Sequence, residues 1–258
     1  MTNRRRPAPA AACAGASELP GASAARPRPR IALVIPTLNE EEAIAGVIGA
    51  TPGDAVDEII VVDGGSTDRT ADVAAAAGAR VLTERTPGYG HACLAGTLRA
   101  ECEIIVFLDG DGSDCPELIP DLLAPLLAGE CDFVIGSRTR GQREPGSMNF
   151  QQVASGYLAG FLLRLLYGVR YTDMSPFRAI RPDMLETLAM KEETYGWNLE
   201  MQMRAARAGL RILEIPVNHR CRTGGQSKVS GTLRGTFVAG TRIIATLLRI
   251  AFEPKAVI

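Results

Sequence analysis

The stretch Phe107-Leu108-Asp109-Gly110-Asp111-Gly112-Ser113-Asp114 decides the fold that we predict for this chain. It completes the apolar run 104–108 and then changes abruptly to a cluster of carboxylates. An apolar run of this length, bounded by turn residues, is typical of a buried strand in a parallel sheet. In open α/β sheets, ligands bind beyond the carboxyl ends of the strands. We therefore expect these carboxylates to lie at a binding crevice.

The carboxylates of Asp109, Asp111 and Asp114 repel one another when they are held close together. A cation would relieve this repulsion, and hard oxygen ligands suit Mg²⁺ or Mn²⁺. The alternative is an ordinary surface turn, rich in Asp and Gly, after a strand. The residues of this stretch leave the two interpretations equally open.

The composition indicates one large α/β domain. The chain has 258 residues, of which 46% are hydrophobic, and this is enough for a sizeable core. Its formal net charge of -1 provides no basic field, so we expect no nucleic-acid partner. The six cysteines lack the paired short spacing of a zinc or redox site, which favours buried thiols in a reducing cytosol.

The two ends of the chain differ in composition from its middle. Residues 1–29 are rich in Ala, Pro and Arg and predict a disordered tail without the apolar core of a secretory signal. No later stretch reaches the roughly 18 uninterrupted apolar residues of a membrane span. Residues 229–258 predict an amphipathic helix in which Arg234, Arg242 and Arg249 share one face.

This C-terminal helix has two interpretations, which the sequence leaves equally open. It could lie in a membrane interface, or it could pack against the catalytic domain or a second subunit of a homo-oligomer. We expect a cytoplasmic protein, and peripheral contact with the inner face of the membrane is left open.

Strands and helices alternate through the middle of the chain, residues 30–228. Strands are predicted at 31–35, 58–62, 79–83, 104–108, 131–135 and 211–215, and helical patterns follow the first four of them, ending near residues 49, 77, 100 and 128. A further helix is predicted at 151–168. Alternation at this spacing predicts a mostly parallel sheet with helices on both faces.

Two loops carry local signals. Ser66 or Thr67 is expected to cap the helix that ends near residue 77. Gly88 and Gly90 are similar to part of a dinucleotide-binding fingerprint, but the third glycine and the acidic partner are misplaced. We therefore expect no Rossmann cofactor site.

Taken in order, the motifs at the strand ends resemble the inverting GT-A glycosyltransferases of family 2. Within that family they are most similar to the dolichyl- and polyprenyl-phosphate sugar transferases, which are dolichol-phosphate mannose synthase-like. The matching motifs are IPTLNE at 35–40, VDGGSTD at 62–68, DGD at 109–111, GSR at 136–138, DMSPFR at 173–178, EM at 200–201 and RTGGQSK at 222–228. The resemblance covers about residues 31–228 and implies a GT-A, Rossmann-like fold.

The resemblance also implies a nucleotide-diphosphate sugar donor of the UDP-glucose or GDP-mannose type, together with Mg²⁺ or Mn²⁺. Donor binding is implied for Pro36, Thr37, Asn39, Glu40, Asp63, Gly64, Gly88, Asp109, Gly110, Arg222, Ser227 and Lys228. Asp109 and Asp111 would hold the cation, and Ser113 stands where relatives often place a Gln, so the third ligand is left open. Arg222, Ser227 and Lys228 fit a diphosphate clamp, because Arg offers a planar fork and Lys a mobile point charge; a basic, solvated loop is the alternative.

The acceptor implied by the resemblance is a polyprenyl phosphate, and a soluble phosphorylated metabolite or a glycan hydroxyl is the alternative. A phosphate is already an anionic nucleophile, whereas a hydroxyl would need a general base, for which Asp173 and Glu200 are candidates. Arg138 is a further catalytic, phosphate-binding candidate, with a surface ion pair as the alternative. The apolar segment 151–168 is either a buried helix or a contact for the acceptor lipid, and 195–198 could form a sugar or acceptor wall.

Two other classes of protein share some of these sequence features. A sugar nucleotidyltransferase uses a similar sheet and metal, but the Gly-rich basic loop it needs after the first strand is replaced by the acidic segment 36–41. A non-catalytic nucleotide-sugar-binding scaffold would be easier to accept without Asp109 or Asp111, and both are present. His91 and His219 lack ligand spacing and are interpreted as structural. The sequence therefore predicts a metal-dependent hexosyltransferase.

Overall fold

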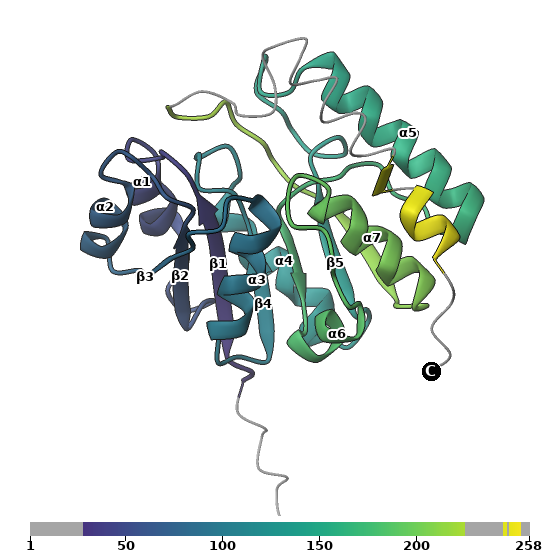
Figure 1. Cartoon of the computed structure of the whole chain (residues 1–258), viewed down its shortest axis with the longest axis horizontal. Helices are drawn as coiled ribbons and strands as arrows, with labels where there is room; N and C mark the ends of the chain where they lie inside the picture. The colour runs from purple at the N-terminus through teal and green to yellow at the C-terminus, as the bar shows by residue number, and fades with distance from the viewer. Residues whose placement is uncertain (1–27, 225–244, 247, 254–258) are drawn as a thin grey trace, which may run out of the picture.

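The computed structural model describes residues 28–224, 245–246 and 248–253 (Figure 1). In this part of the chain, seven strands form one sheet in the order β3-β2-β1-β4-β6-β5-β7. The strands are β1 (Ile31–Thr37), β2 (Glu58–Asp63), β3 (Arg80–Thr83), β4 (Ile104–Phe107), β5 (Phe133–Ser137), β6 (Arg178–Ile180) and β7 (Ile212–Pro216). All neighbours are parallel except at β6, which pairs antiparallel with both β4 and β5. The prediction of a mostly parallel sheet is confirmed.

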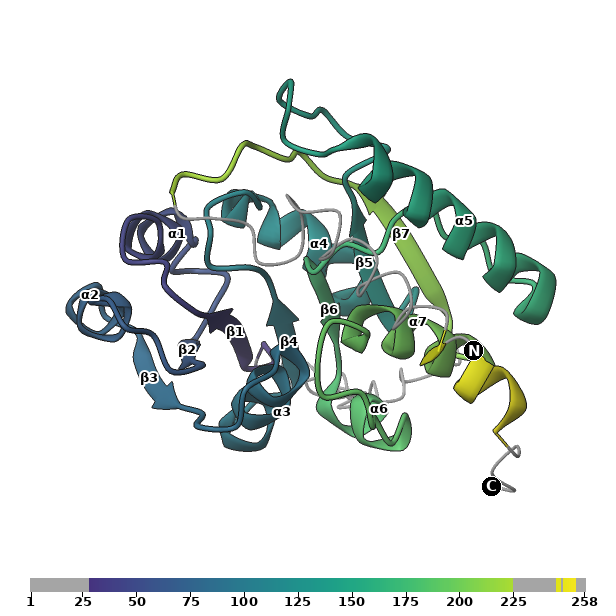
Figure 2. The ribbon, with the colours of Figure 1, turned by 45° about the horizontal axis from the view of Figure 1, so that its top comes forward.

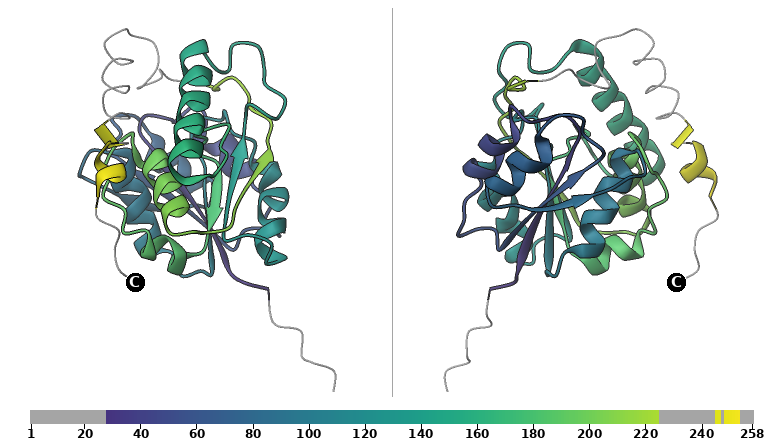
Figure 3. Two further views of the ribbon diagram at one scale, coloured as in Figure 1. Left: turned by 90° about the vertical axis from the view of Figure 1, so that its right-hand side faces the viewer. Right: turned by 60° about the vertical axis from the view of Figure 1, so that its left-hand side comes forward.

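Helices cover both faces of this sheet, as the views in Figures 2 and 3 show. They are α1 (Ile44–Ala50), α2 (Thr70–Ala76), α3 (Tyr89–Arg99), α4 (Ile119–Leu127), α5 (Phe150–Tyr167), α6 (Pro182–Thr187) and α7 (Trp197–Arg207), with a short 3-10 turn, η1 (Pro116–Leu118), before α4. Side chains of α1, α2 and α4 pack into one hydrophobic cluster, and those of α3, α5, α6 and α7 into another. Alternate residues of the central strand β4 point to the two clusters, as the period of a strand requires.

Helix α5 is buried along one narrow edge only. Gly156, Ala159, Gly160 and Leu163 form that edge, and a Cβ atom added to Gly160 would lie 1.9 Å from the backbone oxygen of Tyr171. Most of the large apolar side chains point outward, with Phe150 85% and Leu165 74% exposed, whereas Leu163 is buried. The interpretation of segment 151–168 as a buried helix is therefore wrong for most of its apolar residues, because close approach to the domain uses the small side chains.

Much of the two predicted terminal segments lies outside the described residues. This holds for residues 1–27 of the tail and for Arg234 and Arg242 of the C-terminal helix. Residues 245–246 and 248–252 are helical, and Ile250 is buried in the cluster that contains α7. The proposed division into a tail, a catalytic domain and a C-terminal helix stays a prediction. Among the described helices, none combines the length and the apolar character that crossing a membrane would require.

We expect Gly160→Ala to lower the melting temperature, because the new Cβ would meet backbone that cannot move aside cheaply. Overpacking costs about 1–3 kcal/mol, which for a domain of this size corresponds to roughly 2–10 °C. The matched control is Gly46→Ala in α1, where nothing lies within 4 Å of the added atom and Ala is the better helix former. Thermal unfolding by circular dichroism measures the melting temperature of both variants. A melting temperature of Gly160→Ala equal to that of the wild type would contradict the packing assigned to α5.

Candidate active site

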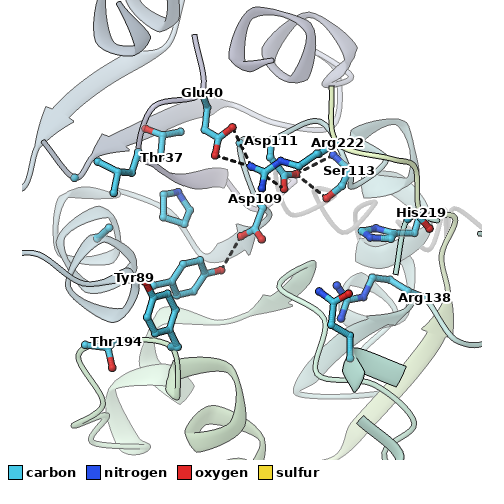
Figure 4. A pocket seen from close by; sticks show the side chains of 18 of the residues that line it. Thr37, Glu40, Tyr89, Asp109, Asp111, Ser113, Arg138, Thr194, His219 and Arg222 are labelled. Carbon is cyan, nitrogen blue, oxygen red and sulfur yellow. Dashed lines mark hydrogen bonds and ion pairs between the residues drawn. The ribbon is translucent and has the colours of Figure 1, made fainter. Parts of the chain in front are cut away.

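The loops at the carboxyl ends of the parallel strands surround one cavity of about 630 Å³ (Figure 4). Its wall includes eleven of the residues predicted from the sequence: Pro36, Thr37, Glu40, Gly64, Gly88, Asp109, Gly110, Asp111, Ser113, Arg138 and Arg222. Four others, Asn39, Asp63, Asp173 and Glu200, are not part of the wall. Ser227 and Lys228 lie outside the described residues. Segments far apart in sequence thus meet where the sheet topology brings the strand ends together.

Asp109, two residues beyond the end of β4, forms hydrogen bonds with two other residues. Its Oδ1 accepts a hydrogen bond from the Tyr89 hydroxyl at 3.1 Å, and the backbone N–H of Asp109 donates to Oδ2 of Asp114 at 3.1 Å. Burial, followed by the negative charges of Asp111 and Asp114, raises the pKa of Asp109 well above its ordinary value. The repulsion expected from the sequence is therefore present in the folded protein.

Asp111 lies between a serine and an arginine in the cavity wall. Its Oδ1 accepts hydrogen bonds from the backbone N–H of Ser113 at 2.9 Å and from the Ser113 hydroxyl at 2.6 Å. Its Oδ2 lies 3.5 Å from Nη2 of Arg222, which also donates to Glu40 at 3.0 Å. A guanidinium therefore bridges two carboxylates of the wall, as Figure 4 shows.

The donor set fits a divalent cation that binds together with a diphosphate. In residues 28–224 and the short C-terminal stretch, no three His, Cys, Asp or Glu side chains form a group that could hold a metal ion by themselves. Mg²⁺, however, is usually bound by one or two carboxylates plus substrate phosphates and water. Asp109 and Asp111 face the same cavity and could supply those carboxylates. Because the Ser113 hydroxyl donates to Asp111, its role as a third ligand stays a prediction.

Asn39 and Asp63 lie behind the wall and join the loops that follow β1 and β2. The Asn39 backbone N–H donates to Ser66 Oγ at 2.8 Å, and Asn39 Oδ1 accepts from the Thr67 N–H at 2.8 Å. Asp63 Oδ2 accepts from the Ser66 N–H at 3.2 Å. The prediction that Ser66 or Thr67 caps the next helix is wrong, because both bind Asn39 and α2 begins only at Thr70, without a side-chain cap. The donor-binding roles of Asn39 and Asp63 stay predictions.

Arg138 enters the cavity from the end of β5 and is oriented by Asp173. The two Asp173 oxygens accept Nε and Nη2 of Arg138 at 2.8 Å each, and Oδ2 also accepts the Arg138 backbone N–H at 2.9 Å. The side chains are only 13% and 2% exposed, so the alternative of a surface ion pair is wrong. Burial opposes the charge of Asp173, but Arg138 outweighs it and lowers the pKa of this carboxyl. Asp173 thus acts on the cavity through Arg138.

Glu200 is fully buried on α7, away from the cavity wall. One of its oxygens accepts the backbone N–H groups of Lys191, at 2.9 Å, and of Glu192, while the other accepts Nε of Arg204 at 2.8 Å. The hypothesis that Glu200 serves as a general base is corrected by this placement, because its carboxylate holds a loop and does not face the cavity.

Sequence reasoning missed several wall residues. Tyr89 gave no signal, because an aromatic residue at a helix start is most often packing. His219, interpreted as structural, is 5% exposed in the wall, and its Nδ1 lies 3.7 Å from Oδ1 of Asp114. Its place between β7 and Arg222 could have indicated this position. Tyr195 of the predicted wall 195–198 lines the cavity, whereas Trp197 is buried in the core.

We expect Asp173→Asn to destabilise the protein by about 3 kcal/mol, because Arg138 would stay buried without its counter-charge. Since the pKa of Asp173 is lowered in the folded state, its contribution is present above the ordinary value of 3.8 and is lost as the pH falls through the lowered value. Urea unfolding at several pH values should show the wild type and the variant converging below about pH 4. A difference that is constant with pH would contradict the ion pair.

Comparisons with known proteins agree with this geometry. The model of glycosyl transferase family 2 matches residues 32–189. An uncharacterized glycosyltransferase of Mycobacterium tuberculosis is 40% identical over 211 residues, covering 81% of this chain and 94% of that protein. The undecaprenyl-phosphate mannosyltransferase of Micrococcus luteus is 36% identical over 228 residues, covering 81% and 91%.

The fold has a solved counterpart. The crystal structure of glucosyl-3-phosphoglycerate synthase from Mycobacterium tuberculosis, in complex with Mn²⁺ and UDP-glucose, is similar with a TM-score of 0.69 and 27% identity, covering 88% of this chain and 81% of that one. The resemblance to family 2 and to the polyprenyl-phosphate sugar transferases is therefore confirmed. The chain belongs to glycosyl transferase family 2 and is a glycosyltransferase with a GT-A fold.

Proposed function

We propose that this chain transfers a sugar from a nucleotide-diphosphate sugar to a polyprenyl phosphate, with a divalent cation and with inversion of the anomeric centre. One observation carries the proposal: a single cavity has the carboxylates of Asp109 and Asp111 on one side and Arg138 on another (Figure 4). The acidic side suits a cation and a donor diphosphate, and Arg138 suits an acceptor phosphate. The name of the undecaprenyl-phosphate mannosyltransferase supports the lipid-phosphate acceptor. The synthase complex with Mn²⁺ and UDP-glucose supports the cation and the nucleotide-sugar donor.

The donor side is proposed to extend from the loops after β1 and β2 to Arg222. Gly110 allows the loop after β4 to pack tightly against the end of β1, since a Cβ at Gly110 would lie 2.6 Å from Thr37 Cγ2. Arg222, already close to Asp111, offers a fork to the diphosphate oxygens. Ser227 and Lys228 complete the proposed clamp.

The reaction follows from these charges. An oxygen of the acceptor phosphate attacks the anomeric carbon opposite the diphosphate; a carbon–oxygen bond forms there, and the bond to the diphosphate breaks with its electron pair leaving on the diphosphate. A divalent cation bound by Asp109 and Asp111 would neutralise the charge that develops on this leaving group. The acceptor is already an anion, so no side chain has to remove a proton. The two candidates for a general base, Asp173 and Glu200, are each paired with an arginine. This is consistent with an acceptor that needs no general base.

The exposed face of α5 favours an acceptor with an apolar chain. Asn149 and Gln152, at the start of this helix, line the cavity. From there the exposed side chains of Phe150, Tyr157, Leu158, Phe161 and Leu165 continue along the helix. Their spacing places them on one broad face, and an exposed apolar face of this kind marks an interaction site. A soluble phosphorylated acceptor is the alternative, because the similar synthase has also been solved with phosphoglyceric acid.

We expect metal-dependent binding of one nucleotide sugar, weakened about 100-fold or more by Asp111→Ala, because the cation loses one of two proposed carboxylate ligands. Calorimetric titration with UDP-glucose, GDP-mannose, UDP and GDP, each with and without Mn²⁺, measures this. Asp121→Ala, which removes an exposed carboxylate of α4, is the control. A nucleotide-sugar affinity that changes neither on removal of Mn²⁺ nor in Asp111→Ala would contradict the proposed donor site.

We expect Phe161→Ser/Leu165→Ser to raise KM for undecaprenyl phosphate about tenfold while KM for a short-chain polyprenyl phosphate changes little, because only the long chain reaches this face. Transfer of a radiolabelled sugar measures both values, with Leu98→Ser, an exposed leucine of α3, as the control. Transfer to phosphoglyceric acid, with none to either lipid, would overturn the lipid acceptor in favour of a soluble one.

A further inference from the structure

The loop of residues 191–196, called here the wall loop, connects the cavity with the C-terminal helix. Thr194 and Tyr195 of this loop line the cavity. The described part of the C-terminal helix, residues 245–246 and 248–252, lies beside α7 (Figure 1) and contacts the wall loop through Thr246 and Glu192. The wall loop thus lines the substrate cavity on one side and contacts the C-terminal helix on the other.

Glu192 joins the cavity wall to the C-terminal helix through one carboxylate. Its Oε1 accepts the Thr194 hydroxyl at 2.8 Å, while its Oε2 accepts the Thr246 hydroxyl at 3.1 Å and lies 3.4 Å from Nη2 of Arg249. The loop folds tightly around this side chain, because a Cβ added to Gly196 would lie 2.8 Å from Cγ of Glu192. Glu192 therefore links the position of the C-terminal helix directly to the position of Thr194.

Arg249 holds a second carboxylate that supports the same loop. Its Nη2 lies 3.2 Å from Oε1 of Glu200. The other oxygen of Glu200 accepts the backbone N–H groups of Lys191 and Glu192, at the start of the wall loop. Because Glu200 is fully buried, its charge depends on the arginines around it. Arg249 thus contacts both carboxylates that fix the loop.

The opposite edge of the wall loop rests on α3. The backbone oxygen of Glu193 accepts the His91 N–H at 3.1 Å, and a Cβ at Gly88 would lie 2.2 Å from that oxygen. A Cβ at Gly90 would lie equally close to the backbone oxygen of Glu192. This close approach of two backbones explains the pair of glycines that only partly matches a dinucleotide fingerprint. The loop is clamped between α3 and the C-terminal helix.

We propose that Glu192 and Arg249 are positioning residues, through which the C-terminal helix sets the place of Thr194 and Tyr195 in the wall of the substrate cavity. This goes beyond the proposed function, since it requires only that a substrate of the glycosyltransferase contacts this wall, whatever the donor or acceptor. Neither side chain lines the cavity. Their loss leaves the reacting groups in place but loosens the wall, so substrate binding weakens more than the chemical step.

The test compares Glu192→Ala, Glu192→Gln, Arg249→Gln and the double variant Glu192→Gln/Arg249→Gln with the wild type. KM and kcat are measured for each substrate, and the emission of Trp197, the only tryptophan of the chain and 2% exposed, reports on the base of the loop. The control is Arg211→Gln, which breaks an ion pair with Asp132 between the starts of β5 and β7.

We expect Glu192→Ala to raise KM for one substrate about tenfold, with kcat within about threefold, and to shift Trp197 emission to longer wavelength. Glu192→Gln has KM and emission values close to those of the wild type, because its amide oxygen still accepts a hydrogen bond from Thr194. The double variant is no worse than the worse single variant, since the two side chains act as one pair. Arg211→Gln leaves KM and emission unchanged.

Wild-type KM and emission in Glu192→Ala would overturn the proposal. It would also fall if KM rose while kcat and the melting temperature fell in every variant, Arg211→Gln included, because that pattern reports general destabilisation. If the wild type transfers no sugar to the chosen acceptors, the proposed function fails separately. The emission spectra and nucleotide-sugar binding then decide: a red shift with weaker binding in Glu192→Ala supports the positioning role, and unchanged values overturn it.

Discussion

Repulsion between the carboxylates beyond β4 is the constraint on which the rest of the structure depends. Asp109 is buried beside Asp111 and Asp114, and its pKa is raised accordingly. The fold offsets this repulsion with donors from separate segments: the Tyr89 hydroxyl from α3, the Ser113 hydroxyl from the turn itself, and Arg222 from beyond β7. Segments that supply these donors must meet at one edge of the sheet, and the order of the parallel strands brings them there.

The antiparallel strand β6 explains why a basic group stands in the same cavity. Because β6 runs against β5, the start of β6 lies beside the end of β5. Asp173, just before β6, thereby reaches Arg138, just after β5, and fixes it with two side-chain hydrogen bonds. A buried ion pair of this kind adds little net stability, since desolvation offsets much of the attraction. Its effect is geometric: it presents a cation in a fixed orientation near an acidic cluster.

The periphery of the domain is organised by charge in one region and by apolar surface in another. Glu192, Glu200 and Arg249 connect the wall loop with the C-terminal helix through buried or half-buried contacts. Helix α5, in contrast, meets the domain mainly through small residues and Leu163, and it leaves most of its large apolar side chains exposed. Both regions adjoin the cavity, since Asn149 and Gln152 at the start of α5 and Thr194 and Tyr195 of the wall loop line it.

The sequence by itself determines the alternation of strands and helices, the acidic motif at the end of β4 and the family, because these depend on hydrophobic periodicity and on contiguous motifs. Only the tertiary structure decides the partners of isolated charges. Asp173 and Glu200 are equal candidates for a base in the sequence, yet each binds arginine, and Arg249 reaches Glu200 from a distant part of the chain. Likewise, the periodicity of α5 does not say which face meets the domain. A hydrophobic pattern is the same for a strand of either direction, so contacts that depend on the antiparallel β6 arise only when the chain is folded.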